Sequence, residues 1–79
     1  MSKWIEINST QKAAISGVYS MIITKTKGGL YHSKAVYGFN DHISVQIIDA
    51  IYHKTEQSAK IGANKKVAIL RALVEKADQ

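Results

Sequence analysis

The chain has 79 residues, no cysteine, no proline and a formal net charge of +5. This length predicts one compact domain, residues 1–79, and the absence of cysteine excludes disulfides and thiolate metal sites. No apolar run reaches the roughly 18 residues of a membrane-spanning helix. The first ten residues also lack the apolar core of a signal peptide, so we expect a cytoplasmic protein.

The positive charge is segregated along the sequence. Between Glu6 and Asp41 there are lysines but no acids, and residues 60–71 again carry only positive charges. Residues 41–59 hold three acids against one lysine. A positive field of this kind attracts polyanions or an acidic protein surface, although net charge also serves solubility alone.

The N-terminal segment has a strand-like alternation. In residues 3–7, two isoleucines alternate with Trp4 and Glu6, which predicts a short first strand. Residues 8–12 are polar and predict a turn. Residues 13–16 fit either the start of the next strand or a helical turn.

A β-hairpin over residues 17–39 is the element that the sequence predicts most directly. Two β-prone runs flank the junction 27–30, K-G-G-L, whose glycines supply the positive φ of a tight turn. Each run has one more apolar face, which predicts a ribbon with one side on the core and the other open. We expect Tyr19, Tyr37 and Phe39 to pack in that core.

Two helices are expected after the hairpin. Asn40 would cap the first, which continues to about Ser58 because isoleucines recur at the 3, 4, 7 and 8 spacing. Gly62 would end it, and Asn64 would cap the second helix. The lysine pair 65–66 would then occupy a first turn, where the helix dipole disfavours cations unless an anion binds.

These elements predict an α+β fold. A small antiparallel sheet, made of the hairpin with an N-terminal strand, would pack against two C-terminal helices in the order β-β-β-α-α. Since no proline protects the strand edges, we expect the hairpin to pair edge to edge with a second copy and form a homodimer.

No residue pattern predicts catalysis. Asp49, His53 and Glu56 fall at i, i+4 and i+7 of the expected first helix and could offer metal ligands. They also form its polar side, where charged residues are ordinary. Gly28 and Gly29 precede a strand and not a helix, which excludes a phosphate-binding loop. We therefore expect no enzymatic activity, no cofactor and no metal.

Basic residues interleaved with aromatic residues favour nucleic-acid binding. Lysines can neutralise phosphates, and rings can stack on unpaired bases. The expected function is a small, basic, nucleic-acid-binding module, for RNA rather than DNA, that acts through phosphate contacts. The expected contact residues are Lys25, Lys27, Tyr31, His32, Lys34, Lys60, Lys65, Lys66 and Arg71.

Two other interpretations stay open. The first is a phage-type inhibitor or antitoxin-like protein that neutralises a host enzyme such as a ribonuclease, with or without RNA bridging the complex. The second is a structural or assembly subunit, which large exposed apolar patches would support. The nucleic-acid interpretation requires that the lysines of the hairpin turn and of the second helix converge on one surface.

Overall fold

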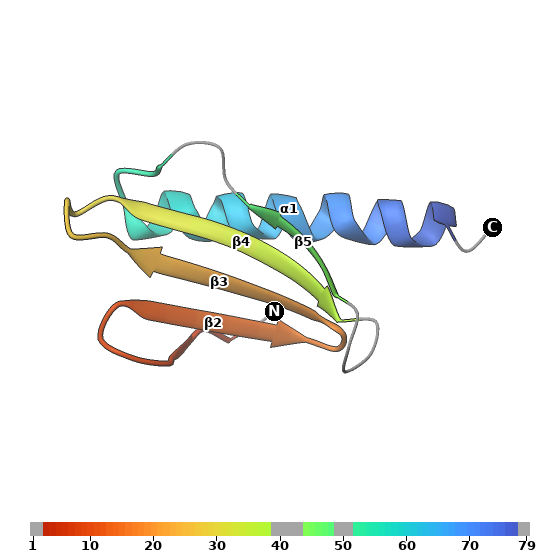
Figure 1. Cartoon of the computed structure of the whole chain (residues 1–79), viewed down its shortest axis with the longest axis horizontal. Helices are drawn as coiled ribbons and strands as arrows, with labels where there is room; N and C mark the ends of the chain where they lie inside the picture. Colours follow the sequence, from red (N-terminus) through yellow and green to blue (C-terminus); the bar gives the residue numbers. More distant parts are fainter. Residues whose placement is uncertain (1–2, 39–43, 49–51, 78–79) are drawn as a thin grey trace.

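The computed structural model describes residues 3–38, 44–48 and 52–77. In these residues, five antiparallel strands form one sheet and one long helix crosses it (Figure 1). The strands pair in sequence order, so the sheet is a meander. The elements are β1 (Ile5–Glu6), β2 (Gln11–Ser16), β3 (Tyr19–Lys25), β4 (Tyr31–Gly38), β5 (Ser44–Ile48) and α1 (Glu56–Ala77).

The predicted hairpin is confirmed as β3 and β4. Its register pairs Met21 with Ala35, and Gly29 in the turn has a φ of 82°, a conformation that other residues rarely adopt. The segment 13–16 belongs to a strand, β2, which turns into β3 through Gly17 at a φ of 63°. The first strand forms but is only two residues long.

The predicted first helix is wrong. Residues 44–48 form β5, which pairs with β4, while Asn40 and residues 49–51 lie outside the described residues. The isoleucine spacing does not distinguish a helix from a strand, because positions four residues apart share one face in both. The segment is also rich in β-branched residues, which favour a strand.

The predicted break at Gly62 and cap at Asn64 are also wrong, because α1 runs through both residues. The helix begins after Thr55, whose hydroxyl accepts a hydrogen bond from the backbone N–H of Ser58 at 3.1 Å. Gly62 serves packing, since a Cβ there would lie 3.1 Å from the ring of His53. The order is therefore β-β-β-β-β-α, with one C-terminal helix in place of two.

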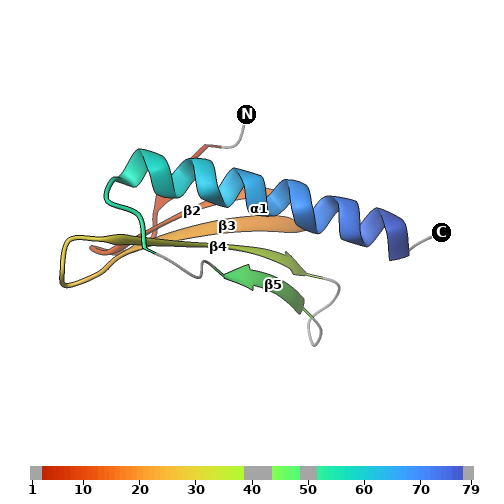
Figure 2. The ribbon, with the colours of Figure 1, turned by 90° about the horizontal axis from the view of Figure 1, so that it is seen from above.

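The helix covers one face of the sheet, and no element of the described residues covers the other face (Figure 2). Tyr19 and Tyr37 pack against the core as predicted, while Phe39 lies outside the described residues. Alanines on both layers let the helix approach the strands closely. The buried cluster between the layers consists of Ala14, Met21, Ala35, Ala63, Val67 and Leu70.

The N-terminal end of α1 is tied to the end of the sheet that carries the β3–β4 turn (Figure 1). Tyr31 and His53 exchange two backbone hydrogen bonds of 2.7 Å, just before the helix begins. Within the described part of the chain, no helix combines the length and the apolar character that crossing a membrane requires.

The hairpin has no free edge. β3 pairs with β2 on its outer side, and β4 pairs with β5. The edges of the sheet are β1 and β5. The predicted edge-to-edge pairing of the hairpin with a second copy is therefore wrong, whereas homodimerisation itself stays a prediction.

Candidate functional site

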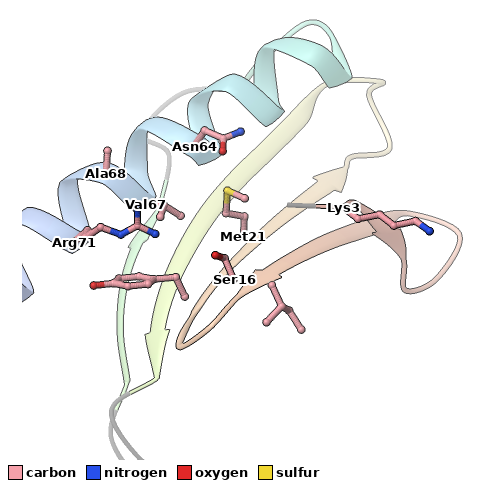
Figure 3. Close-up of a pocket in the computed structure, with 9 residues that line it drawn as sticks. Lys3, Ser16, Met21, Asn64, Val67, Ala68 and Arg71 are labelled. Carbon is pink, nitrogen blue, oxygen red and sulfur yellow. The ribbon is translucent and has the colours of Figure 1, made fainter. Parts of the chain in front are cut away.

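A groove separates α1 from the β2 side of the sheet (Figure 3). Its larger pocket has a volume of about 440 Å³ and no carboxylate in its lining. Lys3 lies on the far side of this pocket from Arg71. The helix contributes Asn64, Val67, Ala68 and Arg71, and the strands contribute Ile15, Ser16, Tyr19 and Met21.

A second pocket of about 210 Å³ lies under the N-terminal end of α1, and charges of both signs line it. Lys12 Nζ lies 2.8 Å from Glu56 Oε1, and Lys60 Nζ lies 3.5 Å from Glu56 Oε2. The hydrogen bond from Lys12 lowers the pKa of Glu56 and raises the pKa of Lys12. Lys25 and Glu6 complete the charged lining.

Two cations of α1 lie over aromatic rings beside this groove. Lys60 Nζ is 5.6 Å from the ring centroid of Trp4, and Arg71 Cζ is 5.0 Å from that of Tyr19. The Tyr19 ring is in turn 5.2 Å from the ring of Tyr37, at an interplanar angle of 46°. Lys60 and Arg71 lie about three helical turns apart, so they face the same side of α1, about 16 Å from each other.

The two pockets and the cation–ring contacts lie along one side of α1, and together we call them the cationic strip. Ion pairs join the smaller pocket to Lys60, and Lys60 reaches Trp4, the chain neighbour of Lys3 in the larger pocket. Its five cations face two carboxylates, those of Glu6 and Glu56. The strip consists of Lys3, Lys12, Lys25, Lys60 and Arg71.

The structure brings only four of the nine predicted contact residues to this groove. Lys25 and Tyr31 line the smaller pocket, Arg71 lines the larger one, and Lys60 lies between them. Of the predicted lysines of the hairpin and the helix, only Lys25 and Lys60 therefore lie at this groove.

The remaining predicted residues lie elsewhere. His32 and Lys34 alternate with buried Ser33 on β4, so they lie on the face opposite α1, where the His32 ring is 5.6 Å from the ring of Tyr52. Lys27 lies in the β3–β4 turn, and Lys65 is exposed on α1.

Lys66 was expected to bind an anion, but its ammonium bonds within the fold. Its ammonium donates hydrogen bonds to Ser33 Oγ at 3.2 Å and to the carbonyl oxygen of Gly62 at 3.3 Å. The idea that Lys65 and Lys66 open a helix is wrong, because α1 begins at Glu56. A serine and a lysine can act as nucleophile and base, but Ser33 is completely buried.

His53 bonds within the fold. Its Nδ1 lies 3.0 Å from Ser58 Oγ, and the expected helical spacing with Asp49 and Glu56 does not exist because β5 precedes this segment. Asp49 lies outside the described residues. Among the residues that the structure describes, no three histidine or acidic side chains gather to hold a metal ion.

Sequence reasoning missed Lys3 and Lys12 as lining residues of the pockets and Trp4 as the ring under Lys60. The alternation of residues 3–7 held a signal, since it separates Trp4 from the neighbouring isoleucines. Trp4 packs against the core, whereas Ile5 is exposed. The only tryptophan of the chain therefore marks the side of the first strand that faces α1.

Comparison with known proteins gives no relative from which a function could be transferred: no family model matches the chain, and neither the curated proteins nor the solved structures contain a significant match. The functional argument depends on the geometry of this chain.

Proposed function

We propose that this protein is a small, non-enzymatic module that binds single-stranded RNA along the cationic strip. The observation that carries the proposal is the position of Lys60 over Trp4 and of Arg71 over Tyr19, beside a pocket without carboxylates. Cations in such a groove neutralise backbone phosphates, and aromatic rings stack on unpaired bases.

The dimensions of the strip suit a short single strand. Lys60 and Arg71 are separated by about 16 Å along the helix axis, at about 1.5 Å per residue. At about 3.4 Å per nucleotide of a stacked strand, this distance corresponds to about five nucleotides. The larger pocket, of about 440 Å³, falls within the usual size range of ligand sites.

Hydrogen-bonding groups in the larger pocket favour RNA over DNA. Ser16 and Asn64 line it, and a hydroxyl or amide there can pair with a ribose 2′-hydroxyl. The amide nitrogen of Asn64 donates to the carbonyl oxygen of Lys60 at 2.9 Å, which orients the side chain at the edge of the groove.

Fluorescence anisotropy with a labelled 12-nucleotide oligouridylate, titrated at several salt concentrations, tests the proposal. The logarithm of the binding constant should fall linearly with the logarithm of salt concentration, by about 0.7 per phosphate neutralised. A Lys60→Gln/Arg71→Gln double variant should lose about two phosphate contacts, so its slope should be shallower by about 1.4.

The matched control is Lys65→Gln/Lys76→Gln, which removes the same charge from two exposed positions of α1 outside both pockets. Its slope should stay close to that of the wild type. Absence of salt-dependent binding by the wild type, or an equal loss in the control, would overturn the proposal. Equal affinity for the deoxy oligonucleotide would overturn the preference for RNA.

A further inference from the structure

The sheet face opposite α1, which we call the open face, has no covering element in the described chain (Figure 2) and carries several exposed isoleucines. Ile5, Ile15 and Ile48 on this face are 60%, 70% and 50% exposed. The strand registers align its side chains in rows across the sheet. The central row, from β1 to β5, is Ile5, Ala13, Ile22, Lys34 and Ile48.

The open face is large enough for a protein interface. The five strands hold 2, 6, 7, 8 and 5 residues, which at about 3.3 Å per residue and about 4.8 Å between strands give a projected area of about 440 Å². The accessible area is larger, because the side chains stand up from the sheet. A specific interface buries at least about 600 Å² per partner, so a stable dimer would have to bury nearly the whole open face.

We propose that the open face is the interface of a homodimer in which two copies pack sheet on sheet. The two-fold axis would lie nearly parallel to β3, between the sheets. Because such an axis reverses the strand order, β3 faces β3, β2 faces β4 of the second copy, and β1 faces β5 of the second copy. This inference is independent of RNA binding and replaces the edge pairing that the fold excludes.

The row pattern is self-complementary about this axis. Ile5 would face Ile48 of the partner subunit, and Ile22 would face its own copy. The long stem of Lys34 would cover the small Ala13 of the partner subunit, which lets the two layers interdigitate.

The neighbouring row and the charges favour the same axis. Ile15 and Val36 lie two strands apart in the next row, so each would meet the other across the interface. An axis perpendicular to the strands would place β4 over β4 and bring the two Lys34 ammonium groups toward each other. Among the described residues, this face carries no carboxylate that could pair with them.

Analytical ultracentrifugation of the full chain measures the dimer directly. The expected mass is twice the 8.7 kDa of one chain at micromolar concentration. The Ile22→Lys variant should weaken dimerisation by on the order of 100-fold or more, because each dimer would bury two further ammonium groups facing each other on the axis, beside those of Lys34. The matched control is Ile61→Lys on α1, where the isoleucine is 47% exposed and away from the open face.

Cross-linking identifies the axis and does not require a destabilising substitution. Because the chain has no cysteine, Ile5→Cys and Ile48→Cys can each be made alone and then mixed. A short bismaleimide should join the mixture into a heterodimer more efficiently than it joins either variant to itself. A monomeric wild type, a dimer insensitive to Ile22→Lys, or preferential cross-linking of each variant to itself would overturn the proposal.

Discussion

Gly62 of α1 lies against the imidazole ring of His53: a Cβ at Gly62 would be 3.1 Å from both Cε1 and Nε2 of that ring and 3.4 Å from Ser33 Oγ. A glycine inside a helix costs about 1 kcal/mol relative to alanine. The close approach explains its presence, because a side chain here would push α1 away from the start of β4.

The first prediction follows from this contact. The His53 ring is held by Ser58 and by the backbone bridge to Tyr31, so it cannot move aside easily. Gly62→Ala should therefore lower the free energy of unfolding by about 1 kcal/mol, as overpacking does, although alanine is the better helix former. Urea unfolding measures this change. In a His53→Ala background, Gly62→Ala should raise the free energy of unfolding, because the ring is absent and alanine is the better helix former. A Gly62→Ala variant that is more stable than the wild type would contradict the proposed contact with His53.

The same glycine shows where prediction from sequence reaches its limit. The turn at Gly28 and Gly29 was predictable because a positive φ is a local requirement, and the structure has it at Gly29. The requirement at Gly62 is tertiary, since it depends on His53, and sequence alone reads such a glycine as a helix end. For residues 44–48, spacing that suits a helix also suits a strand, and only pairing with β4 decides between them.

The candidate site was predictable in part for a similar reason. Lys25, Lys60 and Arg71 were identified from charge alone, and they border the groove. Which face of the sheet α1 covers cannot be read from charge. Lys34 on the open face, and Lys66 on the side of α1 that contacts β4, were therefore grouped with them.

The second prediction tests whether Lys66 stabilises the fold or binds RNA. Its hydrogen bonds to Ser33 Oγ and to the carbonyl oxygen of Gly62 hold α1 on β4. Lys66→Met keeps the aliphatic stem and removes these bonds, so unfolding should become easier by about 1 kcal/mol. The salt slope of RNA binding should not change. A lower slope with unchanged stability would instead assign Lys66 to the RNA contact.

The third prediction concerns the ion pair of Lys12 and Glu56. The hydrogen bond from Lys12 lowers the pKa of Glu56 below its ordinary value of 4.5, so the folded state binds this proton less tightly than the unfolded chain. The stabilisation of the folded state by ionised Glu56 is present above pH 4.5 and is lost as the pH falls through the lowered pKa. The pKa of Lys12 is raised, so the stabilisation by its charged form is present below pH 10.5 and is lost as the pH rises through the raised pKa.

Thermal unfolding of wild type and Glu56→Gln between pH 2 and pH 7 measures this effect. The difference in midpoint should be greatest near neutral pH and should shrink in acid, and it should be small because the pair is exposed. In a Lys12→Met background the pH dependence should be weaker. A difference that is constant with pH would show that the pair does not contribute.

The fourth prediction uses the two glycines of the β3–β4 turn as a matched pair. Gly29 has a φ of 82°, whereas Gly28 lies outside the left-handed region, and a Cβ there would meet only Thr26 Oγ1, at an ordinary contact distance of 4.0 Å. Gly29→Ala should destabilise the fold by about 1–2 kcal/mol, the cost of a left-handed alanine. Gly28→Ala should be close to neutral. Equal effects in urea unfolding would contradict the turn geometry.

The fifth prediction uses Trp4, the only tryptophan, as a reporter of the cationic strip. The Lys60 ammonium lies 5.6 Å from its ring centroid, so Lys60→Gln should shift the intrinsic emission, whereas Lys76→Gln should leave it unchanged. Since such a contact is worth about 0.5–1 kcal/mol at an exposed site, the stability change should be of that size. Bound RNA that stacks near Trp4 should quench its emission in proportion to the anisotropy change. Full RNA binding with unaltered tryptophan emission would place the RNA on another surface.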